Sequence, residues 1–158
     1  MHPNAQLITR FYEGFARLDA EAMAACYHRE VEFSDPVFPE LKGPAAGDMW
    51  RMLVGRATDL AIRFDVKSAD DARGAAHWDA GYTFTKTGRK VNNRIDAEFE
   101  FEDGLIRRHR DRFSLWRWTR MALGPPGVLF GWSSLIRDKV RKQAAEGLDA
   151  YRRKAGRV

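Results

Sequence analysis

The sequence lacks several features that would place the protein in a specialised class. Its single cysteine, Cys26, excludes an internal disulfide bond and a cysteine-based zinc site, which favours a reducing compartment. No apolar run reaches the roughly 18 residues of a membrane-spanning helix, because residues 121–135 are interrupted by Gly124-Pro125-Pro126-Gly127. The first residues contain neither the basic nor the apolar segment of a signal peptide. We therefore expect a cytoplasmic protein with no membrane partner.

Motifs that bind metals or nucleotides are also missing. The sequence has no His-Glu-x-x-His pair and no glycine-rich phosphate loop, so we expect no metal and no cofactor. Internal repeats and low-complexity linkers are absent as well. With 158 residues, 44% hydrophobic and 12% aromatic, the chain is long enough to bury one core. We predict a single domain over residues 1–120, with an apolar loop and an amphipathic helix in residues 121–158 packed on it.

Positive charge is concentrated near the end of the chain. Residues 105–158 contain 14 Lys/Arg and 4 Asp/Glu, whereas residues 1–104 contain 13 Lys/Arg and 18 Asp/Glu, for an overall net charge of +5. Such a basic third can attract nucleic acid, anionic lipid or an acidic partner. A solvated helix face beside an arginine-rich strand explains the same charges more simply, so we expect no nucleic-acid partner.

Hydrophobic periodicity divides the chain into helices, then strands, then a last helix. Apolar residues at helical spacing predict helices over residues 4–18, 20–27, from Pro44 onward, and 133–153. Alternating residues predict strands over residues 31–35, 60–67, 75–85, 90–102 and 105–118. Loops are expected at residues 36–43 and, rich in Gly and Pro, after residue 118. This order predicts an α+β fold in which the first helices pack on one face of a curved mixed or antiparallel sheet.

The segment His109-Arg110-Asp111-Arg112-Phe113 carries the strongest functional signal. In a strand, His109, Asp111 and Phe113 share one face, while the arginines share the other. The arginine side chains can be exposed to solvent, so the histidine and the carboxylate should face the interior. A buried carboxylate needs a partner, a shifted pKa or a chemical role. We therefore predict a pocket lined by His109, Asp111 and Phe113.

Several short segments within residues 4–118 follow a recognisable order. They are Ile8-Thr9-Arg10-Phe11-Tyr12, Leu18-Asp19-Ala20-Glu21, Val31-Glu32-Phe33-Ser34-Asp35-Pro36, Gly43, Thr87-Gly88-Arg89, and Gly104-Leu105-Ile106 leading into His109-Arg110-Asp111. Together they resemble the nuclear transport factor 2 superfamily, which includes ketosteroid isomerases, limonene epoxide hydrolases and SnoaL-like polyketide cyclases. The resemblance implies a cone-shaped sheet wrapped around the N-terminal helices, a cystatin-like α+β barrel, with an extra C-terminal helix outside the shared core.

The isomerases of this superfamily suggest one set of site residues. By resemblance, Asp35 occupies the place of their general base, on the same strand face as Phe33. The tyrosine that holds their oxyanion falls on Phe11 here, with Tyr12 next to it. Their late-strand aspartate corresponds to Asp96, although alternation puts Asp96 on the face opposite to the neighbouring phenylalanines. The oxyanion hole of an isomerase is therefore not evident.

The epoxide hydrolases suggest a second set. By resemblance, Asp111 matches an aspartate of their Asp-Arg-Asp triad, and the other aspartate falls on Asp79. The place of the arginine is taken by His77, which can bridge two carboxylates or act as acid and base itself. Asp35 and Phe33 stand where these enzymes have an asparagine and a tyrosine. These differences argue against an unmodified epoxide hydrolase.

These residues support two hypotheses. The first is a cofactor-independent isomerase, cyclase or hydrolase acting on a small apolar, oxygen-bearing molecule, with Asp35 or Asp111 as general base. His109 would orient the carboxylate or donate a proton. The second is a non-catalytic member of the superfamily that binds a ligand or forms a dimer. The expected substrate-binding residues are Phe11, Tyr12, Phe33, Trp50, His77, Asp79, Asn93, Asp96 and Phe113.

We also expect a homodimer. A curved sheet with apolar residues on both faces has more surface to bury than one set of helices covers, and a symmetric pair is the commonest solution. The tail from Gly124 to Tyr151 is expected to be an ordered lid or dimer arm. Its residues 127–132 would then close the mouth of the cavity.

Overall fold

The computed structural model describes residues 1–157, in which helices precede and follow a six-stranded sheet. The helices are α1 (Pro3–Ala16), α2 (Ala20–Ala25), α3 (Pro44–Arg56), α4 (Leu115–Leu123), α5 (Pro125–Phe130) and α6 (Ser134–Lys154). The strands are β1 (Tyr27–Ser34), β2 (Leu41–Lys42), β3 (Ala61–Ala69), β4 (Arg73–Phe84), β5 (Arg89–Glu102) and β6 (Leu105–Arg112). This order confirms the predicted α+β fold. No helix within residues 1–157 is both long enough and apolar enough to cross a membrane.

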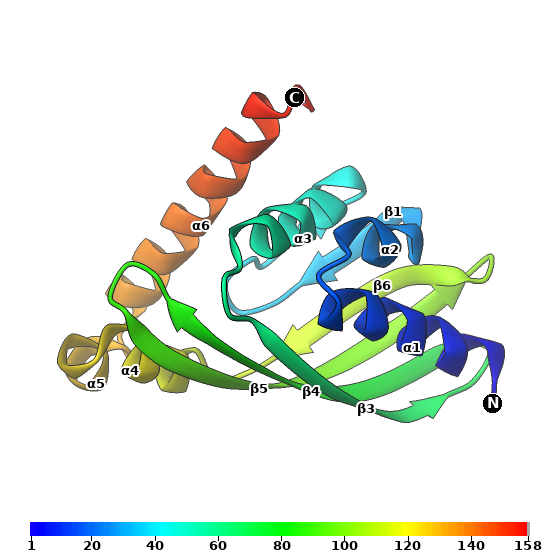
Figure 1. Ribbon diagram of the computed structural model, residues 1–158, viewed down its shortest axis with the longest axis horizontal. Coiled ribbons are helices and arrows are strands. Elements are labelled where there is room, and N and C mark those ends of the chain that lie inside the picture. Colours follow the sequence, from blue (N-terminus) through cyan, green and yellow to red (C-terminus); the bar gives the residue numbers. More distant parts are fainter. Residues whose placement is uncertain (158) are drawn as a thin grey trace.

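The strands form one curved sheet in the order β2-β1-β6-β5-β4-β3, as Figure 1 shows. β1 and β6 run parallel, and every other neighbouring pair runs antiparallel. Asp103 and Gly104 make the tight turn between β5 and β6, and both have positive φ angles, of 55° and 73°. The parallel pair matters most for the site, because it places the end of β1 beside the end of β6.

Helices α1, α2 and α3 cover the concave face of this sheet (Figure 1). Local chemistry sets where they begin: Asp19 caps α2 by accepting the Ala22 N–H at 3.0 Å, and α1 and α3 each start with a proline. The apolar stripe of α1 is buried against the sheet through Leu7, Ile8, Phe11, Tyr12 and Phe15. The core therefore lies between the first three helices and the inner face of the strands.

The last strand is shorter than predicted. β6 ends at Arg112, and residues 115–123 form α4 instead of continuing the strand to residue 118. Ser114 starts this helix, because its side chain accepts the Arg117 N–H at 3.1 Å. Trp116 and Trp118 alternate as they would in a strand, but two residues are too few to outweigh the cap. The loop predicted after residue 118 likewise contains a helix, α5.

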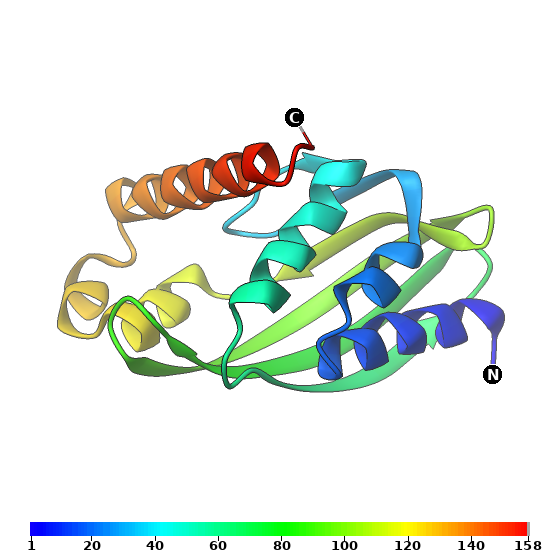
Figure 2. The ribbon, with the colours of Figure 1, turned by 45° about the horizontal axis from the view of Figure 1, so that its top comes forward.

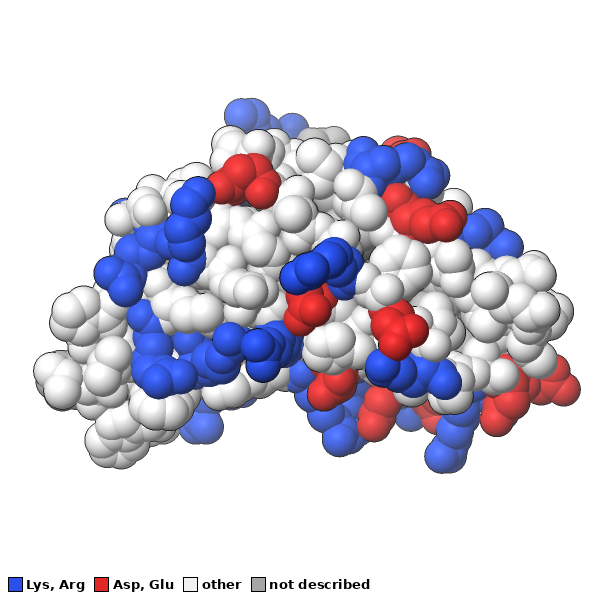
Figure 3. Space-filling model, turned by 60° about the horizontal axis from the view of Figure 1, so that its bottom comes forward, with Lys and Arg blue, Asp and Glu red and all other residues white. Residues whose placement is uncertain are grey.

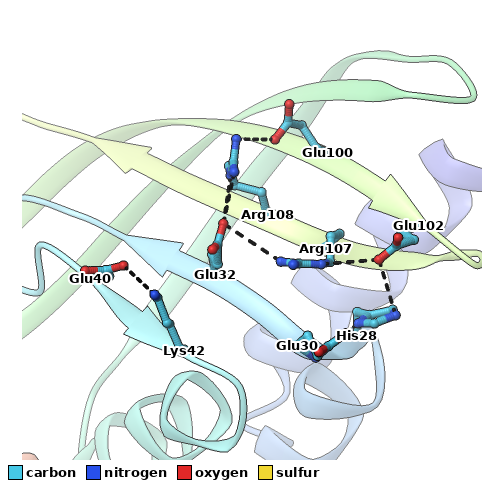
Figure 4. Close-up of polar contacts among 9 residues, drawn as sticks. All are labelled: His28, Glu30, Glu32, Glu40, Lys42, Glu100, Glu102, Arg107 and Arg108. Carbon is cyan, nitrogen blue, oxygen red and sulfur yellow. Dashed lines mark hydrogen bonds and ion pairs between the residues drawn. The ribbon is translucent and has the colours of Figure 1, made fainter.

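The outer face of the sheet carries charged side chains. Arg108 contacts Glu32 at 3.0 Å and Glu100 at 2.8 Å, and Arg112 contacts Glu98 at 3.3 Å. Figure 4 shows how such pairs connect β1, β6 and β5. The expectation of apolar residues on both faces is therefore wrong. Homodimer formation remains a prediction, but the argument from two apolar sheet faces no longer supports it.

The C-terminal helix α6 is attached to α3 through one buried carboxylate. Asp48 of α3 is fully buried and accepts hydrogen bonds from Arg152 Nε at 2.9 Å and from Arg51 Nη1 at 3.0 Å. Arg157 Nε lies 3.2 Å from the same carboxylate. In Figure 2 the C-terminal end of α6 reaches α3. A single aspartate therefore holds two arginines from the end of the chain.

Candidate functional site

His109 lies in the closed interior between the sheet and the helices. Its side chain is fully buried, and the ring centroids of Phe11, Phe33 and Phe99 lie 4.5 to 5.4 Å from its own. The ring of Trp50 stacks on it at 6.3 Å. These aromatic side chains pack around His109 and separate it from the surface on the concave side.

The aromatic residues predicted to bind substrate belong to this packing. Phe11, Phe33 and Trp50 are at most 2% exposed. Tyr12 is fully buried and stacks on Phe64 at 5.4 Å. The structure thus places these four predicted residues in the core, where they shape the interior and do not line the pocket described below.

A chain of hydrogen bonds passes through His109. Trp50 Nε1 donates to the Tyr27 hydroxyl at 2.8 Å, and that hydroxyl lies 2.8 Å from Nδ1 of His109. On the other side, Nε2 of His109 lies 2.9 Å from Oδ1 of Asp111, which also accepts Nε1–H of Trp78 at 3.3 Å. An indole N–H can only donate, so the Tyr27 hydroxyl accepts from Trp50 and makes its second hydrogen bond with Nδ1 of His109. A carboxylate can only accept, so His109 donates its Nε2–H to Asp111.

This network fixes the orientation of Asp111. Asp111 is 3% exposed, and its Oδ1 accepts both Nε2–H of His109 and Nε1–H of Trp78. The second oxygen, Oδ2, has no hydrogen-bond partner among the described residues. His109 therefore acts on Asp111 by positioning it.

The parallel pairing of β1 and β6 brings Asp35 next to Asp111. Phe33 lies opposite His109 in this pair, so the next inward positions on the two strands are Asp35 and Asp111. Arg108, Arg110 and Arg112, which alternate with His109 and Asp111 on β6, are exposed. The alternation predicted for His109 and Asp111 is confirmed.

Asp35 and Asp111 line an open pocket of about 390 Å³ at the end of these strands. Its other lining residues are Ser34, Pro36, Pro39, Arg110, Arg112 and Phe113. The pocket lies outside the aromatic interior, so a ligand would sit at the rim of the cone. Arg141 of α6 donates to the Pro36 carbonyl at 2.8 Å, which brings the C-terminal helix to the edge of the pocket.

Asp35 closes a tight turn, and its partial burial sets it apart from a matching turn elsewhere. Its Oδ1 accepts the backbone N–H groups two and three residues later, at 2.7 and 2.6 Å. Asp70 makes the same turn, with distances of 2.8 and 2.7 Å, but is exposed. Backbone hydrogen bonds lower the pKa of Asp70. Burial raises the pKa of Asp35 from 3.8 to about 7, and the charge of Asp111 adds to the rise.

Asp35 should make the folded protein less stable as the pH rises from about 4 to about 7. The unfolded chain loses this proton near the ordinary pKa of 3.8, whereas the folded protein keeps it up to about 7. Because the unfolded state binds fewer protons in this interval, the free energy of unfolding falls with rising pH. Urea denaturation at a series of pH values should show Asp35→Asn gaining about 2–4 kcal/mol relative to wild type across the interval. A constant difference would contradict the raised pKa.

The predicted residues of β4 and β5 lie elsewhere. Nδ1 of His77 is 2.8 Å from Asp96 Oδ1, and its Nε2 is 3.3 Å from Asp79 Oδ1, on the outer face of the sheet. The hydrogen bond to Asp96 raises the pKa of His77. Trp78 is the inward residue of this segment, so the prediction that these three line the pocket is wrong. Asn93 is buried on the inner side but does not line the pocket.

Two residues of the network, Tyr27 and Trp78, were not predicted. Tyr27 begins β1, whereas apolar periodicity had placed it at the end of a helix. For Trp78 a signal existed, because Ala76 and Ala80 flank it at strand spacing. Small residues on both sides of a tryptophan leave room for helices to pack on that face.

One group of side chains in the described part of the chain has the spacing of a metal site. Donor atoms of His28, Glu102 and Asp103 lie within 4.8 Å of one another. Figure 4 shows His28 beside Glu102. The group lies at the turn between β5 and β6 and shares no residue with the pocket. Two of its members are exposed, and exposed acidic groups often gather without an ion.

The helices and the curved mixed sheet define a small α+β protein, and its sequence places it in a family. The protein-family model of the SnoaL-like domain matches residues 8–109 of the sequence, and the chain belongs to this family. The predicted resemblance is thereby confirmed. No curated protein matches the sequence.

Solved structures share the fold at low sequence identity. A proposed polyketide cyclase from Xanthomonas campestris pv. campestris is 23% identical, with a TM-score of 0.66 over 75% of this chain and 96% of that one. An NTF2-like protein of unknown function from Burkholderia pseudomallei K96243 is 18% identical, with a TM-score of 0.66 over 77% and 98%. An LEH-like epoxide hydrolase from M. tuberculosis is 17% identical, with a TM-score of 0.60 over 85% and 95%. These likenesses establish the NTF2-like fold and assign no activity.

Proposed function

We propose that this protein is a cofactor-independent enzyme that moves a proton on a small, mainly apolar molecule bearing an oxygen atom. The observation that supports this is the pair of carboxyl groups, Asp35 and Asp111, in one pocket. Their surroundings differ, since Asp111 is held by two ring N–H donors while burial brings the pKa of Asp35 to about 7. A carboxyl with a pKa near neutrality exchanges protons readily at that pH. Asp35 is the proposed general base.

In the proposed step, the carboxylate of Asp35 takes a proton from a carbon atom next to a carbonyl group. The electron pair of the broken C–H bond moves toward the carbonyl and forms an enolate. Returning the proton to another carbon completes an isomerisation. In a cyclisation, the enolate carbon instead bonds to a second carbonyl carbon, whose oxygen receives the proton. In the hydrolysis of an epoxide, Asp35 takes a proton from water as the water oxygen bonds to one epoxide carbon. The bond from that carbon to the epoxide oxygen breaks, and the freed oxygen receives the proton.

Asp111 and His109 have supporting roles in this proposal. Asp111 places a negative charge beside Asp35 and thereby raises its affinity for a proton. His109 is a positioning residue, because its closed surroundings keep it from the substrate and its Nε2 holds Asp111. The alternative that His109 donates a proton to the substrate has no support in this geometry.

A non-catalytic binding role is the second candidate. The aromatic side chains that fill the interior favour it, because no deep cavity surrounds a ligand there. A pocket of about 390 Å³ can still hold a small molecule. Binding alone therefore cannot separate the two candidates, and turnover has to be measured.

The direct test is a thermal-shift screen of steroids, polyketides and terpenoid epoxides. A molecule that binds only the folded protein stabilises it by about 2.7 kcal/mol at 100 times its Kd. Each stabilising compound is then incubated with the protein and followed by mass spectrometry and, in heavy water, by deuterium uptake. Stabilisation with turnover or deuterium uptake supports the enzyme. Stabilisation without either supports the binding role, and a panel without any stabilising member contradicts the proposed substrate class.

A further inference from the structure

We infer that the end of the molecule formed by α4, α5 and the start of α6 binds the surface of an anionic membrane. Eight large hydrophobic side chains are exposed among the described residues, and five of them lie here. These five, which we call the apolar tip, are Trp116, Val128, Leu129, Trp132 and Leu135. Their exposed fractions run from 41% for Trp116 to 79% for Leu135. Apolar side chains gathered in this way mark an interaction surface.

The apolar tip is held as a fixed projection. Gly127 of α5 and Gly131, which follows that helix, lie so close to Thr119 of α4 that a Cβ atom on either glycine would collide with it. The indole of Trp132 donates to the Leu129 carbonyl at 2.8 Å. In Figure 1, α4 and α5 lie at one end of the molecule, away from α1 and α2. The tip is therefore presented outward by close helix packing.

Basic side chains lie beside the apolar tip. Residues 80–95 and 112–137 contain eight Lys/Arg and no Asp/Glu. The two segments are in contact, because Arg89 Nε donates to the Met121 carbonyl at 2.9 Å. Three of the eight have an acidic partner, namely Lys90, Arg112 and Arg137. The five without an ion pair in the described part of the chain are Lys86, Arg89, Arg94, Arg117 and Arg120.

This combination fits the boundary of an anionic bilayer. Leucine and valine side chains enter the acyl region, tryptophan rings prefer the headgroup level, and arginine and lysine bind lipid phosphates. Arg120 already lies over the ring of Trp116 at 4.2 Å, which places a cation and an indole at the same depth. Figure 3 shows Lys and Arg gathered at this end beside an uncharged lobe. The sequence predicted no membrane partner for lack of a spanning segment, but surface binding does not require one.

Two other occupants fit the surface less well. A second copy of the chain, joined through the same patch, would bring the five unpaired basic side chains against their own counterparts. The phosphates of a nucleic acid could bind the basic side chains, but Val128, Leu129 and Leu135 have no ring on which a base can stack. An anionic bilayer satisfies both the charge and the aliphatic side chains.

Vesicle flotation tests the inference. The full chain should float with vesicles of phosphatidylcholine and phosphatidylglycerol, with a blue shift of tryptophan emission, and bind phosphatidylcholine alone much more weakly. Leu129→Ser combined with Trp132→Ser should weaken binding at least about tenfold, because two buried side chains are lost. Lys86→Gln combined with Arg94→Gln should weaken it about 25-fold at low salt, since each basic residue contributes roughly a factor of five. Added salt should weaken binding of the wild type.

Matched variants away from the apolar tip serve as controls. Leu53→Ser removes an apolar side chain of α3 that is 40% exposed, and Arg29→Gln with Lys154→Gln removes two basic side chains. Both controls should bind like wild type. Equal loss in control and tip variants, or no flotation with anionic vesicles, would overturn the inference. So would a dimer in solution that the Leu129→Ser, Trp132→Ser protein loses, or tight binding to DNA without binding to vesicles.

Discussion

Asp35→Asn should slow turnover by about 100- to 10,000-fold, the usual contribution of a general base. The amide cannot accept the proton, but its oxygen can still accept the two backbone N–H groups of the turn. The variant should therefore melt at or above the temperature of the wild type. Rates are measured with a substrate from the thermal-shift panel, and melting is measured by circular dichroism.

Asp70→Asn is the matched control for this prediction. Asp70 forms the same turn with the same pattern of backbone hydrogen bonds, but it is exposed and lies outside the pocket. It should keep full activity. An Asp35→Asn protein as active as Asp70→Asn would assign Asp35 to the turn alone and leave the pocket without its proposed base.

Asp111→Leu should lower the free energy of unfolding by about 3 kcal/mol or more. Leucine is similar in size but leaves two buried donors, Nε2–H of His109 and Nε1–H of Trp78, without an acceptor. An unpaired buried donor costs about 1–3 kcal/mol. Asp111→Asn keeps an acceptor oxygen and should cost much less. Urea denaturation of the two variants gives the comparison.

Equal stability of Asp111→Leu and Asp111→Asn would contradict the hydrogen-bond network. A second readout comes from His109→Phe, which retains a ring in the aromatic interior but cannot bind Asp111. If His109 is a positioning residue, His109→Phe should lower kcat and leave the melting temperature within a few degrees of Asp111→Asn. Unchanged kcat would remove the positioning role.

The inner face of β6 could be predicted because strand alternation is a local property. The alternation of basic and apolar residues around His109 and Asp111 defines the two faces without reference to any other strand. The same reasoning failed for His77 and Asp79, because Trp78 and its alanine neighbours offered an equally good inner face. Only the pairing of β4 with β5 decides which face of β4 points toward the core.

The filled interior could not be predicted from the sequence. Phe33, Trp50 and Phe99 lie far apart in the chain, and either a ligand or their own rings could occupy the space they surround. Their meeting around His109 depends on the curvature of the sheet and on the angle at which α3 crosses it. The pairing of β1 with β6, which brings Asp35 next to Asp111, is likewise indicated by no local pattern. Only the resemblance to the superfamily suggested that these two residues share a pocket.

The parallel pairing of β1 with β6 also determines when the pocket forms during synthesis. Asp35 leaves the ribosome roughly 4–15 s before Asp111 at ordinary rates of translation. Until β6 is made, β1 has only the two-residue strand β2 as a neighbour within the sheet. The long loop between β1 and β6 must close before their contacts stabilise the chain, and such closure is slow. The pocket therefore forms only when the sheet is completed, so a molecule that has the pocket is one whose whole core has folded.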